Sequence, residues 1–155
     1  TEILCRWILN LSNKSIWFNN LILMFQKEVA DRILSDYNTS NYGRLSVLTN
    51  WRLNVKKLFD ITPNCFYPKP KVDSSLLLFS PKKIFFKFKN PNNLEKITRI
   101  FFRHRRKMIK NSFRQIFSEY IEISNKYKIN LNLRPQNINF ETYYKLTQEY
   151  EKLRG

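Results

Sequence analysis

Basic side chains are concentrated in one segment of the 155-residue sequence. Residues 82–114 contain twelve lysines and arginines and a single acidic residue, Glu95, so they carry +11 of the net charge of +16. The rest of the chain is mildly basic, and its many Asn, Lys and Ile residues are also what AT-rich coding would give. The position of the charge is therefore more informative than its total, and it indicates a polyanionic partner.

Cations in this segment also repeat at helical spacing. A single helix over 93–117 would place five of them on one face, at spacings of 4, 3, 4 and 4, with Arg105 and Lys107 beside it; the five are Arg99, Arg103, Arg106, Lys110 and Arg114. Like charges at i,i+4 cost about a few tenths of a kcal/mol each in an isolated helix. An ordinary solvated face mixes in Glu, so the pattern favours phosphate binding over simple solvation. His104 has no acidic neighbour in sequence and is interpreted as a surface or packing residue.

Segment 66–74 combines two aromatic residues, two prolines and two lysines. The prolines fix φ and remove two backbone donors, which predicts a stiff and extended loop. Such a loop can present Phe66 or Tyr67 as a flat surface with Lys69 and Lys71 beside it, and this is how proteins hold an unstacked base. The alternative is that the two aromatic rings fill the core beneath the loop, and composition leaves both interpretations open.

Several classes of protein are excluded by composition. Two cysteines sixty positions apart, Cys5 and Cys65, with one histidine give neither a zinc module nor a disulfide framework, and fit a reducing cytosol. Two glycines, Gly43 and Gly155, are too few for a phosphate-cradling or dinucleotide loop. No apolar run approaches 18 residues, and no signal-peptide pattern follows Thr1, so we expect no membrane association.

Hydrophobic periodicity predicts an α/β layer over residues 1–81. The apolar run Leu21–Phe25 is short enough for a strand buried on both faces, which suggests a parallel sheet. The predicted elements are helices over 2–11, 27–35 and 45–53, strands over 21–25, 55–61 and 75–79, and loops over 36–43 and 62–73.

After Pro81 the pattern becomes helical. Asn92 and Glu95 resemble a capping box that opens the long helix over 93–117, and Asn139 is expected to cap a last helix. We therefore predict two domains, 1–81 and 82–155, of which the second is a small helical unit.

Several segments together resemble the ribosomal RNA adenine dimethyltransferase family. Residues 66–74 resemble its FxPxPKVxS motif, and Arg103–Lys107 through Asn111 and Ser112 resemble its basic helix. Further similar segments are Leu23–Ile33, Tyr42–Val47 and Arg134-Pro135. The basic helix and the Arg-Pro pair favour the small-subunit dimethyltransferase over the antibiotic-resistance branch of the family.

The resemblance implies the later strands and helices of a Rossmann-like methyltransferase sheet, followed by an all-α RNA-binding domain. The full enzyme would transfer methyl groups from S-adenosylmethionine to N6 of two adjacent adenines near the 3′ end of small-subunit rRNA. Phe66 would stack on the target adenine, and Lys69 and Lys71 would hold neighbouring phosphates. The RNA-binding cations would be Arg99, Arg103, Arg105, Arg106, Lys107, Lys110 and Arg114.

The sequence also departs from the family pattern. The glycine-rich cofactor loop, the acidic cofactor-binding residues and the Asn-Leu-Pro-Tyr motif all precede the position that matches Thr1, so we expect no cofactor-binding residue and no activity in residues 1–155 alone. We expect a C-terminal portion of a longer enzyme or a gene fragment, acting as a monomer on a pre-30S-type ribosomal particle in the cytoplasm or an organelle. The alternative is a non-catalytic nucleic-acid-binding relative, such as a mitochondrial transcription-factor-like protein.

Overall fold

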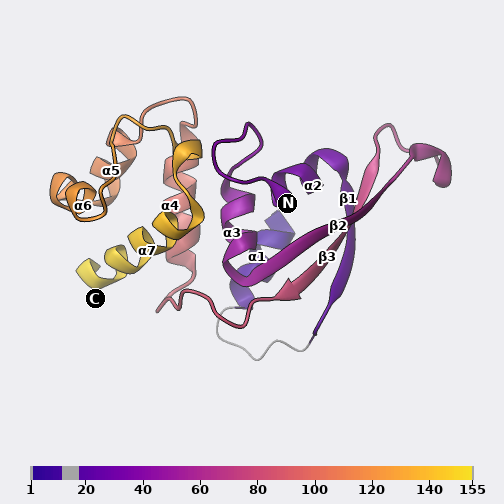
Figure 1. Ribbon diagram of the computed structural model, residues 1–155, viewed down its shortest axis with the longest axis horizontal. Helices are drawn as coiled ribbons and strands as arrows, with labels where there is room; N and C mark the ends of the chain where they lie inside the picture. The colour runs from indigo at the N-terminus through magenta and orange to yellow at the C-terminus, as the bar shows by residue number, and fades with distance from the viewer. Residues whose placement is uncertain (1, 12–17, 155) are drawn as a thin grey trace.

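The computed structural model describes residues 2–11 and 18–154 (Figure 1). Its elements confirm the helices and strands predicted within residues 1–81. In chain order they are α1 (Glu2–Asn10), β1 (Leu21–Gln26), α2 (Lys27–Leu34), α3 (Arg44–Arg52), β2 (Leu53–Ile61), β3 (Ser74–Pro81), α4 (Asn92–Arg103), α5 (Lys110–Ile116), α6 (Tyr120–Lys126) and α7 (Phe140–Arg154), with short 3₁₀ turns at Pro63–Cys65 and Pro135–Asn137. None of the helices in these residues is long and apolar enough to cross a membrane.

The three strands form an antiparallel sheet in the order β1-β3-β2. β3 lies in the centre of the sheet, and two of its side chains, Leu77 and Phe79, are fully buried. Leu77 is opposite Leu23 of β1, and Phe79 is opposite Val55 of β2. A register shift between Lys57 and Phe59 bends β2 toward its end.

The prediction of a parallel sheet with a fully buried strand at 21–25 is wrong. In β1 the odd-numbered residues are half-buried against the core, whereas Ile22 and Met24 are 53% and 51% exposed. A short apolar run is equally compatible with an edge strand that has one covered face, and run length alone does not separate the two cases.

The helices α1 to α3 lie between the sheet and the helices α4 to α7 (Figure 1). Hydrogen bonds between these parts include one from the indole N–H of Trp51 in α3 to the carbonyl of Phe86, which precedes α4 (2.7 Å), and one from the hydroxyl of Tyr144 in α7 to the carbonyl of Val47 in α3 (3.0 Å). The hydrophobic core runs without interruption from α1 to α7. The division into domains 1–81 and 82–155 stays a prediction.

The predicted single helix over 93–117 is wrong, because the chain turns back between α4 and α5. Phe101 and Phe113 pack edge to face with ring centroids 5.4 Å apart. Twelve residues in one straight helix would separate them by about 18 Å. Contact between the two rings therefore requires the break, in which Ile109 is fully buried and the apolar Met108 is 58% exposed.

The two predicted helix caps have different outcomes. No side-chain cap is formed by Asn92, which is the first residue of α4; its N–H instead donates to the side-chain oxygen of Asn90 (3.0 Å). Glu95 is drawn away by two arginines, so the predicted capping box is wrong. The cap by Asn139 is confirmed, because its side-chain oxygen accepts the N–H of Thr142 at 2.9 Å.

Candidate nucleic-acid interface

The turn between α4 and α5 exposes four cations at consecutive or near-consecutive positions. We call residues 103–110 the basic turn; its exposed cations are Arg103, Arg106, Lys107 and Lys110. The turn is held by hydrogen bonds from the N–H of Lys107 to the carbonyl of His104 (2.8 Å) and from the N–H of Ile109 to that of Leu133 (2.9 Å). None of the ion pairs within residues 2–11 and 18–154 involves these four cations.

The other three predicted RNA-binding cations have protein partners. Arg99 forms an ion pair with Glu95 on its own helix (2.6 Å), and Arg114 lies over the ring of Tyr120, 5.7 Å from its centroid. The guanidinium of Arg105 donates to the side chain of Gln136 and to the carbonyls of residues 39 and 40. The single stripe expected from the sequence is thus wrong in geometry, whereas RNA binding by these residues stays a prediction.

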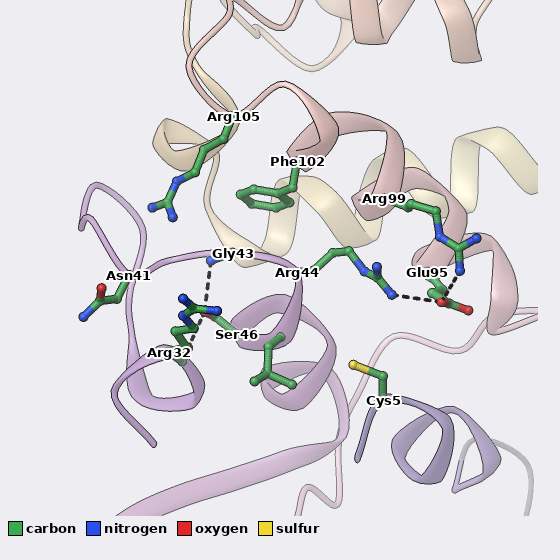
Figure 2. Close-up of a pocket in the computed structure, with 11 residues that line it drawn as sticks. Cys5, Arg32, Asn41, Gly43, Arg44, Ser46, Glu95, Arg99, Phe102 and Arg105 are labelled. Carbon is green, nitrogen blue, oxygen red and sulfur yellow. Dashed lines mark hydrogen bonds and ion pairs between the residues drawn. The ribbon is translucent and has the colours of Figure 1, made fainter. Parts of the chain in front are cut away.

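A cavity of about 610 Å³ lies beside the basic turn, where α1, α2 and the start of α3 meet α4 (Figure 2). Its polar lining comes from Arg32, Asn41, Gly43, Arg44, Ser46, Glu95, Arg99 and Arg105, and its apolar lining from Cys5, Leu45 and Phe102. The structure therefore brings Arg99 and Arg105 together at this cavity, apart from the exposed cations of the basic turn.

The start of α3 is fixed by one serine. The hydroxyl of Ser46 accepts the N–H of Gly43 (3.1 Å) and donates to the carbonyl of Arg32 (2.6 Å), so it ties α3 to α2 at the cavity wall (Figure 2). Neither Ser46 nor Arg44 is among the site residues predicted from the sequence. A Gly-Arg-x-Ser start is a recognisable N-terminal helix signal, but the pairing of Arg44 with Glu95, 51 positions later, leaves no local signal.

The loop that carries Phe66 is the tip of the β2–β3 hairpin. The N–H of Phe66 donates to the carbonyl of Pro63 (3.2 Å), which closes the 3₁₀ turn before it. Phe66 is half-buried, Tyr67 is fully exposed, and neither belongs to the hydrophobic core. Lys69 and Lys71 are exposed. Within the described residues this arrangement disfavours the interpretation that the two aromatic rings fill the core. It leaves an aromatic ring on a stiff loop where a base could stack.

A charged cluster holds the two strands together where they enter this loop. One carboxylate oxygen of Asp60 accepts the hydroxyl of Ser75 (2.6 Å), and the other lies 3.0 Å from the ammonium of Lys57 and 3.5 Å from that of Lys27. The hydrogen bond from Ser75, followed by that from Lys57, lowers the pKa of Asp60 to about 2. The strands are therefore joined below the loop by an aspartate that stays ionised at neutral pH.

The two predicted parts of the RNA site lie at opposite ends of the structure. The hairpin tip with Phe66 is at one end of the long axis, and the basic turn belongs to the helical layer at the other (Figure 1). The described residues thus do not form one compact site, and a ligand touching both must be extended. Nucleic acid meets this requirement.

This fold and surface define a class of protein: an α/β protein with an antiparallel three-stranded sheet, a helical layer and a strongly basic turn. Comparison with known proteins narrows it: the family model for ribosomal RNA adenine dimethylase matches residues 1–152. The chain belongs to the ribosomal RNA adenine dimethylase family.

Relatives and solved structures agree with this assignment. Over its whole length the chain is 62% identical to a protein of Pelagibacter ubique (strain HTCC1062) named ribosomal RNA small subunit methyltransferase A, of which it covers 59%. A Wolbachia sp. subsp. Drosophila simulans (strain wRi) protein of the same name is 39% identical over 96% of this chain and 53% of that protein. The chain thus spans a little over half the length of these relatives.

Among solved structures, a dimethyladenosine transferase from Plasmodium falciparum superposes with a TM-score of 0.75 at 25% identity, over 97% of this chain and 64% of that one. The 23S rRNA methyltransferase ErmE superposes with a TM-score of 0.59 at 16% identity, over 94% of this chain and 59% of that one, which supports the fold alone. The predicted fold class, the later strands and helices of a methyltransferase sheet with helices after it, is confirmed.

Proposed function

We propose that the full-length protein is an S-adenosylmethionine-dependent rRNA adenine N6,N6-dimethyltransferase. It acts on two adjacent adenines near the 3′ end of small-subunit rRNA, as a monomer, on a pre-30S-type particle in the cytoplasm or an organelle. The observation that carries the proposal is the 62% identity over the whole chain to a protein named ribosomal RNA small subunit methyltransferase A.

The residues of this chain would hold the RNA and the target base. An adenine must leave its stack before its amino group can reach a buried methyl donor. Phe66, half-buried on a stiff loop and outside the core, would stack on the extruded base. Lys69 and Lys71 would bind the phosphates beside it, while the basic turn would bind the RNA helix through its backbone.

The cavity residues offer little that would hold S-adenosylmethionine. The carboxylate that lines the cavity, Glu95, is paired with two arginines, and the chain has two glycines. Among these residues there is also no cluster of His, Cys, Asp or Glu that could hold a metal ion. We therefore propose that the cofactor, which supplies the methyl group, is held by residues outside 1–155.

Methyl transfer is tested directly with the full-length protein and unmethylated small ribosomal particles. Labelled S-adenosylmethionine should transfer its methyl groups to adenine N6 near the 3′ end of the rRNA. Tight RNA binding without any methyl transfer would overturn the proposal in favour of the non-catalytic alternative.

RNA binding by the basic turn is tested with the triple variant Arg103→Gln, Arg106→Gln, Lys110→Gln. Its affinity for a 3′ fragment of the rRNA should fall about tenfold or more, and the slope of log affinity against log salt should flatten by about 0.7–0.9 per lost phosphate contact. The control removes three exposed cations elsewhere, Lys56, Lys145 and Lys152. Equal losses in both variants would show that net charge alone attracts the RNA.

A further inference from the structure

The cavity beside the basic turn carries an excess of positive charge that protein groups do not neutralise. Four arginines line it, Arg32, Arg44, Arg99 and Arg105, against one described acidic residue, Glu95. Of the four, Arg32 is also paired outside the cavity lining, with Glu28 on its own helix. Clusters of like charge in a concave site raise the local potential and attract an anion.

A single carboxylate oxygen orients two of these arginines. Oε1 of Glu95 accepts Nη2 of Arg44 at 2.9 Å and Nη2 of Arg99 at 2.6 Å, and Figure 2 shows it between the two guanidinium groups. The side chains of Arg44 and Arg99 remain 34% and 66% exposed. Arg44 and Arg99 thus share one negative charge, and their guanidinium groups keep N–H donors for a further acceptor. A guanidinium binds phosphate with two parallel hydrogen bonds.

The rest of the cavity wall is also electropositive and fixed in position. Arg105 is tied to the carbonyls of residues 39 and 40, and the nine-residue helix α3 begins at the cavity. The N-terminus of a helix carries partial positive charge, which adds to that of the arginines. The positive charge of the cavity thus comes from arginines of α2, α3, α4 and the basic turn, together with the start of α3.

We propose that this cavity binds a backbone phosphate of the RNA, with Arg44 and Arg99 as its ligands. At about 610 Å³ the cavity is within the usual range of ligand sites, so it admits a phosphate with its adjoining sugars. Because α3 packs on the sheet and α4 belongs to the helical layer, the bound strand touches both layers at once. This inference rests on the proposed function and adds a contact, Arg44, that the basic turn does not include.

The test measures the affinity of the full-length protein for the 3′ rRNA fragment in three variants. Arg44→Gln and Arg99→Gln should each weaken binding about tenfold and flatten its salt dependence. Glu95→Gln has the opposite sign: it removes the negative charge of the cavity and should tighten binding. Lys145→Gln, which breaks the exposed ion pair with Glu141, is the control and should change affinity less than twofold.

The outcomes separate the two proposals. A wild-type protein that does not bind the rRNA fragment contradicts the proposed function, whereas a wild type that binds and an Arg44→Gln variant that binds equally well contradict this inference. Should Arg44→Gln fail to fold, the more exposed Arg99→Gln decides. Weaker binding by Glu95→Gln would overturn the inference, because the three residues would then act through structure.

A second arm replaces the RNA by inorganic phosphate. If phosphate raises the melting temperature of the wild type but Arg44→Gln leaves RNA affinity unchanged, the cavity binds a free anion and the RNA assignment is wrong. If Arg44→Gln loses both the phosphate effect and RNA affinity, the backbone phosphate is supported.

Discussion

At the scale of single residues, Asp60 shows how a hydrogen bond inside a sheet sets a protonation equilibrium. Its pKa is lowered to about 2, first by the hydroxyl of Ser75 and then by Lys57. Because the folded pKa lies below the ordinary value of 3.8, the ionised carboxylate stabilises the fold above about pH 4. This contribution is lost as the pH falls from about 4 through about 2.

Ser75→Ala should therefore raise the pKa of Asp60 toward 3.8. Ser75 is fully buried and its hydroxyl lies 2.6 Å from the carboxylate, so its removal takes away the largest cause of the shift. The carboxyl carbon of Asp60 is followed by NMR across the titration. Lys57→Gln is the matched variant and should give a smaller rise. A pKa in Ser75→Ala equal to that of the wild type would contradict the assignment.

Phe66→Ala separates base stacking from core packing in the full-length protein. A buried Phe replaced by Ala costs about 3–5 kcal/mol, but Phe66 is half-buried and outside the core, so we expect a smaller loss of stability. If the proposed function holds, methyl transfer should fall strongly, because the adenine would no longer be held in line with the methyl donor. Phe66→Tyr should keep much of the activity, since its ring still offers a π face.

The two measurements are a melting curve and a methyl-transfer assay on each variant. Severe destabilisation of Phe66→Ala would defeat the stacking role. Fully exposed Tyr67 is the neighbouring control, since Tyr67→Ala removes a ring from the same loop without removing the proposed stacking partner.

At the scale of elements, the cap of α7 is a local feature with a measurable energy. The side-chain oxygen of Asn139 accepts the N–H of Thr142, one of the donors at a helix start that lack a partner within the helix. Asn139→Ala should cost about 1 kcal/mol, which lowers the melting temperature of a protein of this size by about 2–4 °C. Asn139→Asp keeps an acceptor and should lose less; equal losses would contradict the cap.

Local signals in the sequence predicted most elements, because caps, turns and hydrophobic periodicity act within a few residues. Helix α3 and the cap at Asn139 are examples. The break between α4 and α5 was not predictable in this way: the cations at 99, 103, 106, 110 and 114 continue the helical spacing across it. What ends α4 is tertiary packing, since Phe101 and Phe113 must meet in one core.

The candidate site was also predictable only where its residues lie close together in the sequence. The exposed cations of the basic turn and the loop with Phe66 were found from composition and spacing, because each lies within one stretch of chain. The cavity was not, because Arg44 and Glu95 are 51 positions apart and meet through the packing of α3 on α4. A single sequence does not show that two residues so far apart in the chain are in contact.

At the scale of the whole molecule, binding of RNA and binding of the methyl donor are expected to reside in different parts of the protein. The basic turn, the cavity and the hairpin tip all lie within the described residues, and all present cations or rings. A site for S-adenosylmethionine requires acidic residues that can accept hydrogen bonds from the cofactor, and Glu95, the acidic residue described at the cavity, is paired with Arg44 and Arg99. The chain also spans 59% of its Pelagibacter relative.

Residues 1–155 alone should therefore bind the 3′ rRNA fragment without binding S-adenosylmethionine. Residues 1–155 should keep most of the salt-dependent RNA affinity of the full-length protein, because the phosphate contacts of the basic turn are retained. Isothermal titration with S-adenosylmethionine should give no heat of binding, while circular dichroism on the same sample establishes that the helices are formed. Micromolar affinity for the cofactor would show that these residues hold it after all, and loss of RNA binding in a folded sample would assign the RNA contacts to residues outside 1–155.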